Sequence, residues 1–201
     1  MKNGGMSYKA DIIAGALKLP ESRLIADLLL RHVDAEGWKD AIVTKNVVQA
    51  RSPATARRLT KLIRGRLETM GPGLWKLVRD GNSDLATHAV FAAAVKHSPL
   101  LADFLKIVVS EQYQLFSKKL TNKLWANYVE GCRERDADMP SWNETTQRGL
   151  QSSVFQMLAL VGYIENTRSL KLQTVHIADQ VVRYLKANQE EFTLRCIQVS
   201  P

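Results

Sequence analysis

The sequence of 201 residues lacks several features that mark common protein classes. Two cysteines, Cys132 and Cys196, are too few for a disulfide framework and fit a reducing cytosol. The first residues have no apolar stretch of the kind that a signal peptide needs. The longest nearly apolar run, residues 154–164, is shorter than the roughly 20 residues that span a bilayer. These absences favour a cytoplasmic protein without a membrane partner.

Motifs of catalysis and metal binding are also missing. The histidines are scattered, without H-E-x-x-H or the Cys/His spacing of a zinc site; they are His32, His88, His97 and His176. No G-K-[ST] follows the glycines at 71–73, and no G-x-S-x-G motif is present. We therefore expect no enzymatic activity, no metal and no cofactor, and we expect both cysteines to be buried as small hydrophobic residues.

Acidic residues are nearly absent from one region, residues 45–79. It holds nine lysine or arginine residues and a single acid, Glu68, so it carries the whole net charge of +8. The other 166 residues hold 19 basic and 19 acidic side chains, which cancel. On a merely solvated helix, acids four residues away would relieve the repulsion between cations. Their scarcity favours contact with nucleic acid, ahead of contact with an acidic protein surface.

Helical spacing of apolar residues dominates the chain and predicts an all-α fold. The expected helices cover about 20–33, 38–49, 52–70, 83–96, 98–116, 121–136, 143–161 and 177–188, with a short turn at 75–79. Ser52 and Pro53 supply an N-cap and a first-turn proline. Ser141 and Glu144 have the S-x-x-E spacing of a capping box, which predicts a helix start after Ser141.

The helix that begins at Ser52 has a basic face opposite an apolar face. At about 100° per residue, Arg57, Lys61 and Arg64 fall within a sector of about 60°, and the apolar residues fall on the other side. Arg66 falls in the apolar sector, and we expect its charged end to extend into solvent near the end of the helix.

A helix at 38–49, a tight break at 50–51 and this basic helix match a helix-turn-helix layout, in which the second helix enters the major groove of DNA. Arginine, serine and threonine at the start of such a helix contact phosphates and base edges. The predicted nucleic-acid contacts are Lys45, Arg51, Ser52, Thr55, Arg57, Arg58, Lys61 and Arg64.

The C-terminal part predicts a winged-helix-like arrangement with one short β-hairpin, at 162–173, after the helix 143–161. Arg148, Arg168 and Lys171 are possible second nucleic-acid contacts. Residues 141–201 hold six basic and five acidic side chains, so a hairpin that only covers the core is an equally open alternative.

The expected domain order has three consecutive parts. Residues 1–80 form a helix-turn-helix-like N-terminal domain, 81–137 a helical bridge and 138–201 a winged-helix-like domain.

Four long stretches carry a family resemblance. They are ADIIAGALKLPESRLIADLLL (10–30), RSPATARRLTKLIRGRLETM (51–70), AVFAAAVKHSPLLADFL (89–105) and GYIENTRSLKLQTVHI (162–177). In this order they resemble the BrxA proteins of bacterial BREX phage-exclusion systems, and the resemblance runs from about Tyr8 to Val199.

The resemblance implies a small all-helical cytoplasmic protein that binds double-stranded DNA through the segment 51–70. It also implies a non-catalytic role beside other BREX proteins, which methylate host DNA and block phage replication. Two alternatives stay open: a scaffold subunit that docks an acidic protein partner, and an RNA-binding adaptor like NusB, a fold to which the family has been compared. We expect a monomer or weak oligomer without strong sequence specificity.

Overall fold

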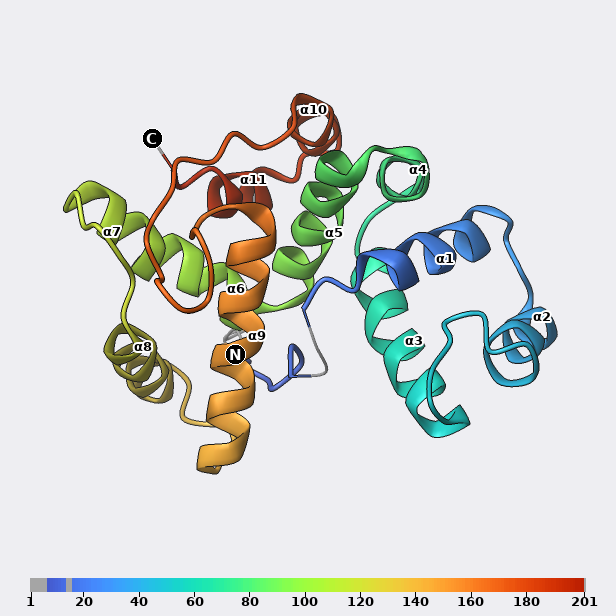
Figure 1. Ribbon diagram of the computed structural model, residues 1–201, viewed down its shortest axis with the longest axis horizontal. Coiled ribbons are helices and arrows are strands. Elements are labelled where there is room, and N and C mark those ends of the chain that lie inside the picture. Colours follow the sequence, from blue (N-terminus) through green and yellow to red (C-terminus); the bar gives the residue numbers. More distant parts are fainter. Residues whose placement is uncertain (1–6, 14–15, 201) are drawn as a thin grey trace, which may run out of the picture. The chain divides into compact units, whose positions relative to one another are not determined.

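The computed structural model describes residues 7–13 and 16–200, and this part of the chain is helical, with no strand (Figure 1). The α-helices are α1 (Leu19–Leu30), α2 (Ala35–Lys39), α3 (Pro53–Glu68), α4 (Pro72–Asp80), α5 (Ser83–His97), α6 (Pro99–Asp103), α7 (Ser110–Gln114), α8 (Asn122–Arg135), α9 (Glu144–Val161), α10 (Asp179–Ala187) and α11 (Glu191–Ile197). Two π-helical turns, η1 (Asp40–Thr44) and η2 (Phe104–Val109), follow α2 and α6 directly. The predicted all-α class is confirmed.

The chain forms two compact units, and each unit combines segments that are distant in sequence. Unit 1 contains the described residues of 1–16 and of 190–201 together with Ser98–Ile177. Unit 2 contains Leu17–His97 and Ala178–Gln189. The three consecutive domains expected from the sequence stay a prediction.

In unit 2, α1 packs against α3, α4 and α5, and α10 packs against α4 and α5. Ile25, Leu67 and Leu74 are fully buried in this unit. Helix α10 contributes the buried Leu185 and the Tyr184 hydroxyl, which accepts a hydrogen bond of 2.7 Å from the backbone N–H of Gly71. This bond lies just before α4 and so fixes the chain between α3 and α4.

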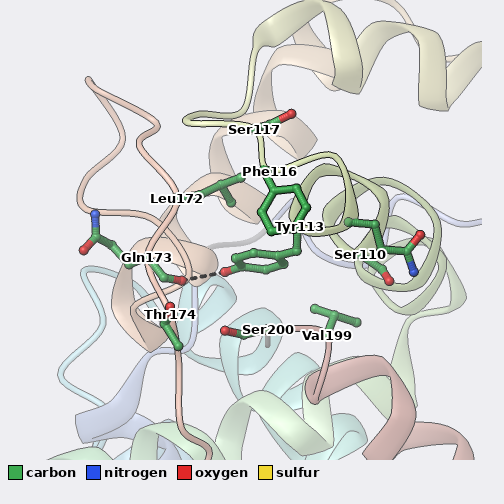
Figure 2. A pocket seen from close by; sticks show the side chains of 10 residues that line it. Ser110, Tyr113, Phe116, Ser117, Leu172, Gln173, Thr174, Val199 and Ser200 are labelled. Carbon is green, nitrogen blue, oxygen red and sulfur yellow. Dashed lines mark hydrogen bonds between the residues drawn. The ribbon is translucent and has the colours of Figure 1, made fainter.

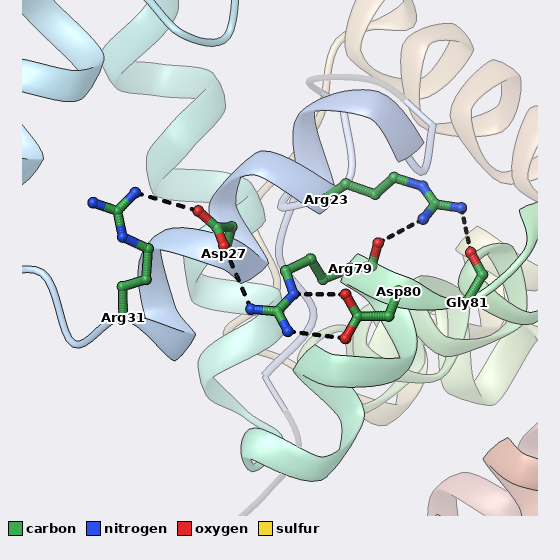
Figure 3. Close-up of polar contacts among 6 residues, drawn as sticks. All are labelled: Arg23, Asp27, Arg31, Arg79, Asp80 and Gly81. Atoms are coloured by element: carbon green, nitrogen blue, oxygen red, sulfur yellow. Dashed lines mark hydrogen bonds and ion pairs between the residues drawn. The ribbon is translucent and has the colours of Figure 1, made fainter.

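A polar cluster joins the end of α4 to α1 (Figure 3). The Arg23 guanidinium donates hydrogen bonds of 2.7 Å to the backbone oxygens of Arg79 and Gly81. The Arg79 guanidinium forms ion pairs with Asp80, at 2.7 Å, and with Asp27, at 3.4 Å. Its hydrogen bond to Asp80 lowers the pKa of that carboxyl. Arg79, one of the cations of residues 45–79, is therefore held by ion pairs within unit 2.

The core of unit 1 contains a cluster of aromatic rings. The ring centroid of Phe104 lies 5.2 Å from those of Trp125 and Tyr128, in edge-to-face geometry, and 6.3 Å from that of Phe155. Phe104 is fully buried, and the Tyr128 hydroxyl donates a hydrogen bond of 2.7 Å to the backbone oxygen of Leu100. These contacts join η2, α8 and α9.

Both cysteines are buried in unit 1, which confirms the expectation from the sequence. Burial raises the pKa of both thiols, to about 11 for Cys196. The thiols therefore stay protonated and unreactive near neutral pH.

The Tyr8 hydroxyl, also in unit 1, donates a hydrogen bond of 2.6 Å to Asp103. Burial together with this bond raises the pKa of Tyr8 to about 12.

The hairpin predicted at 162–173 is wrong, because no strand forms there and a single antiparallel bridge joins Ile164 to Leu172. The side chain of Asn166 accepts the backbone N–H groups of Arg168 and Ser169, each at 2.9 Å. Leu170 then takes a left-handed conformation, with φ of 52°. Pairing of the two segments beside this turn is limited to the bridge and to two backbone hydrogen bonds, from Glu165 to Lys171 at 2.8 Å and from Gln173 to Tyr163 at 2.9 Å.

The helix predicted at 38–49 is also wrong at its end, since η1 stops at Thr44. Asn46 and Gln49 have left-handed φ angles of 45° and 51°. The Asn46 side chain also bonds to the backbone N–H and oxygen of Ala50, at 3.0 and 2.8 Å, which favours a loop over a helix. Residues 45–52 therefore separate η1 from α3, in place of a tight break.

Four local details also differ from the expectations. Asn143, rather than Ser141, caps α9, because its side chain accepts the backbone N–H of Thr146 at 2.8 Å. The segment around 75–79 is a full helix, α4, and the sequence pattern did not predict α11. Arg66 is buried, with 1% of its surface exposed, so it does not extend into solvent.

Candidate nucleic-acid interface

Helix α3 starts where the sequence predicted. Ser52 is the N-cap, and its hydroxyl accepts the backbone N–H of Thr55 at 3.2 Å, while Pro53 occupies the first turn. The same hydroxyl lies 3.0 Å from the Thr55 hydroxyl. Ser52 and Thr55, both predicted as contacts, therefore hold the start of α3 in this structure.

The apolar side of α3 is buried and determines which side faces solvent. Ala56, Ile63 and Leu67 are at most 1% exposed and pack into the core of unit 2. Burial of such a face is the main source of stability for a helix of this length. The opposite side is left for the charged residues.

That opposite side, together with one residue just before the helix, carries a cationic surface, which we call the α3 surface: Arg51, Arg57, Arg58, Lys61 and Arg64. The first four are exposed, and no carboxylate of the described residues lies within 4.0 Å of their side-chain nitrogens. Their positive charges are thus available to an anion from solution, as the spacing in the sequence predicted.

Two other predicted cations are held by neighbours. The Nε atom of Arg64 donates a hydrogen bond of 2.7 Å to Glu68, and its guanidinium lies 4.4 Å from the centroid of the Trp38 ring. The Lys45 ammonium lies 2.6 Å from Asp40. Both ion pairs are solvent-exposed, so each contributes at most about 1 kcal/mol to stability, and an incoming phosphate can compete for either cation.

A groove of about 450 Å³ lies between α3 and the segment α2–η1 of the same unit. It is lined by Trp38, Lys39, Ile42, Val43, Arg57, Thr60, Lys61 and Arg64. Its floor is apolar and its rim is cationic. Lys39 was not among the predicted contacts, because packing of this segment beside α3, rather than spacing along the chain, brings it to the groove.

The three possible second contacts lie in unit 1. Arg148 and Glu144 form an exposed ion pair at 2.5 Å on α9. Arg168 and Lys171 are both exposed, and a β-bridge places Lys171 opposite Lys119. Lys118 and Lys119 are also exposed, and they were not among the predicted contacts, since only the backbone pairing with Lys171 brings them to this segment.

Other kinds of site have little support in the described residues. Their His, Cys, Asp and Glu side chains form no group of three or more that could hold a metal ion. Within this part of the chain, no helix is long and apolar enough to cross a membrane.

The described part of the chain is thus all-helical and carries a cationic surface at α3, beside a groove. A sequence model of the BrxA family matches residues 6–189. The chain is 51% identical over 193 residues to a protein named BREX protein BrxA from Paramagnetospirillum magneticum (strain ATCC 700264 / AMB-1). The matched residues make up 96% of this chain and 97% of the relative. The chain belongs to the BrxA family.

Two further comparisons agree with this assignment. A second BREX protein BrxA, from Escherichia coli O9:H4 (strain HS), is 32% identical over 180 residues, which make up 90% of this chain and 84% of the relative. The crystal structure of an uncharacterized protein from Magnetospirillum magneticum is similar in fold, with a TM-score of 0.91 and 49% identity. The structural match covers 96% of this chain and 99% of the chain in that crystal structure.

Proposed function

We propose that this protein is a non-catalytic, double-stranded DNA-binding component of a cytoplasmic BREX anti-phage defence system. The observation that carries the DNA-binding part is the α3 surface, with four exposed cations that no described carboxylate neutralises. The BREX part rests on membership of the BrxA family and on the names of the relatives. Other BREX proteins are its expected partners, and the chain acts as a monomer or weak oligomer.

The proposed mechanism is electrostatic. Arg51, Arg57, Arg58 and Lys61 replace the counterions of DNA phosphates, which gives modest affinity with a steep dependence on salt. The first turn of α3 contains no acid, so the dipole of the helix adds to the attraction of a phosphate. Lys45 and Arg64 join once a phosphate displaces their carboxylate partners.

Entry of α3 into the major groove is the finer part of the proposal. A helix-turn-helix joins its two helices by about three or four residues, whereas residues 45–52 separate η1 from α3. Weak sequence specificity follows from this longer loop and from the few side chains that can reach base edges. Arg148, Arg168 and Lys171 stay possible second contacts.

The test is a double charge reversal, Arg57→Glu with Lys61→Glu. We expect it to abolish binding of a labelled duplex in fluorescence anisotropy while the circular dichroism spectrum stays unchanged, because both residues are exposed. The matched control is Arg183→Glu with Lys186→Glu, which reverses the same charge on exposed residues of α10 in the same unit. Normal binding by the first variant, or equal loss in both, would show that α3 is not the site.

The groove supports a second candidate function, docking of an acidic protein segment with an apolar side chain. Phosphates need no apolar floor, whereas such a segment would bury the partly exposed Val43 and pair with the cationic rim. Val43→Ser separates the two functions, because it reduces the apolar floor and keeps every charge. Loss of a co-purifying BREX protein with unchanged duplex affinity would favour the scaffold role.

The same anisotropy experiment separates DNA from RNA. An RNA hairpin added as a competitor displaces the labelled duplex only weakly if duplex DNA is the ligand. Stronger displacement by the hairpin than by unlabelled duplex would favour an RNA-binding adaptor.

A further inference from the structure

An exposed aromatic side chain stands at the end of α7 in unit 1. The chain turns there, with φ of 52° at Phe116, and leaves 92% of Phe116 and 64% of Leu115 exposed. A left-handed conformation is uncommon for a bulky residue, and full exposure forgoes the burial energy of a phenylalanine. We call residues 115–119 the Phe116 turn.

Phe116 borders a pocket of about 510 Å³, shown in Figure 2. Its lining is uncharged and consists of Ser110, Tyr113, Gln114, Phe116, Ser117, Leu172, Gln173, Thr174, Val199 and Ser200. The Tyr113 hydroxyl donates a hydrogen bond of 2.6 Å to the backbone oxygen of Gln173, which fixes this ring at the pocket. Besides Tyr113, the lining has four hydroxyl groups and two side-chain amides. Of these hydroxyls, Ser117 donates to the Gln112 side chain at 2.8 Å and Ser200 accepts the backbone N–H of Val175 at 2.9 Å.

Three lysines are neighbours in sequence of residues that line this uncharged pocket. Lys118 and Lys119 directly follow the lining residue Ser117, and Lys171 precedes the lining residue Leu172. The backbone holds the two segments together, because the N–H of Leu172 donates to the oxygen of Lys118 at 3.0 Å and Lys119 is bridged to Lys171. All three lysines are exposed.

The acidic residues near this pocket do not cancel the positive charge of the three lysines. Glu165 accepts a hydrogen bond of 2.9 Å from the Ser169 hydroxyl, and its backbone N–H donates to the oxygen of Lys171 at 2.8 Å. Glu111 is exposed on α7. No acid interrupts the sequence between Glu111 and Glu130, so the Phe116 turn itself carries only positive charge.

We propose that this pocket binds an unpaired nucleobase of single-stranded nucleic acid. Phe116 and Tyr113 offer the base a stacking surface, the uncharged polar side chains suit its neutral hydrogen-bonding edges, and Lys118, Lys119 and Lys171 contact the flanking phosphates. Aromatic side chains beside a basic backbone track are the usual means of binding single strands. The site lies in unit 1 and does not depend on the α3 surface.

The test measures binding of a fluorescein-labelled oligothymidine of about 12 nucleotides at about 50 mM salt. Phe116→Ala should weaken this binding about 5- to 100-fold, the effect of losing one stacked base, and should leave a blunt duplex bound as before. Because Phe116 is exposed, the variant keeps its fold. The matched control is Leu160→Ala on α9, which removes another exposed apolar side chain, outside the pocket, and should change nothing.

Two further arms make the outcome decisive. Lys118→Ser with Lys119→Ser should reduce the salt dependence of oligothymidine binding by about 1.4 in slope. An oligonucleotide with 5-iodouracil should crosslink to Phe116 or Tyr113 under ultraviolet light. Equal affinity of wild type and Phe116→Ala, or crosslinks confined to α3, would overturn the proposal. Loss of a protein partner by Phe116→Ala, without loss of oligothymidine, would assign the turn to protein docking instead.

Discussion

The α3 surface and the Phe116 turn present positive charge in two different ways. On α3, the cations follow a regular helix with its other side buried, and their number accounts for much of the net charge. In the Phe116 turn, two lysines stand beside an exposed aromatic ring on an irregular backbone. The first arrangement suits a uniformly charged ligand such as duplex DNA, and the second suits a ligand with exposed flat faces.

This difference shows that net charge alone does not identify a binding surface. Unit 1 contributes little to the charge excess, yet its pocket combines aromatic rings, hydroxyl groups and flanking lysines. Conversely, Arg66 and Arg79 belong to the basic region but are used inside unit 2. Exposure and the absence of a carboxylate partner distinguish the cations that are available to a ligand from those that hold the fold together.

The contrast between the two surfaces depends on Phe116 being exposed and not part of the core. Phe104→Ala, in the buried aromatic cluster of the same unit, should reduce the free energy of unfolding by about 3–5 kcal/mol. Phe116→Ala should change it by less than about 0.5 kcal/mol, because the ring is exposed. Denaturant unfolding of both variants measures this. A large loss with Phe116→Ala would place its ring in the core.

A smaller effect separates unpaired from paired cations near α3. Arg57→Ser should reduce the slope of log affinity for duplex against log salt by about 0.9, the value of one phosphate contact. Lys45→Ser should reduce it by less, since Asp40 already neutralises Lys45. Anisotropy titrations over a series of salt concentrations give both slopes. Equal reductions would mean that the ion pair opens without cost when DNA binds.

Two substitutions of Ser52 test its role as the cap of α3 separately from its proposed role as a DNA contact. Ser52→Ala should lower the free energy of unfolding by about 1 kcal/mol because α3 loses its cap, whereas Ser52→Asp keeps the cap. A carboxylate at this position repels phosphate, so Ser52→Asp should weaken duplex binding at unchanged stability. If Ser52→Asp binds DNA normally, the start of α3 does not approach the backbone.

The smallest effect concerns pH and the structural cations of unit 2. Arg79 lowers the pKa of Asp80, so the folded protein binds its proton less tightly than the unfolded chain does. This pair therefore stabilises unit 2 above the usual carboxyl pKa, and the contribution is lost as pH falls through the lowered pKa. The melting temperature of Asp80→Asn should fall less between pH 5 and pH 3 than that of wild type. Identical curves would show that the pair contributes nothing.

The regular parts of the molecule could be predicted from the sequence. The Ser-Pro start of α3, its apolar stripe and the helix expected at about 121–136 follow local patterns, and the structure has each of them. The exposed face of α3 follows from the same period of 3.6 residues. The family assignment, predicted from four stretches of sequence, is also confirmed.

The irregular parts could not be predicted, because their causes are not periodic. Three residues that are not glycine adopt left-handed conformations, so the sequence does not indicate a turn at these positions; they are Asn46, Phe116 and Leu170. The meeting of Lys119 with Lys171, and of Lys39 with α3, depends on tertiary packing between segments far apart in sequence. The pocket beside Phe116 therefore has no signature in the sequence.

The most direct test of duplex binding by the α3 surface is the anisotropy of a labelled duplex of about 30 base pairs with the wild-type protein, at about 50 and 200 mM salt. Several phosphate contacts predict binding at the lower salt and a loss of affinity of at least about tenfold at the higher. Absence of binding at 50 mM salt, or an affinity that does not change with salt, would contradict the account.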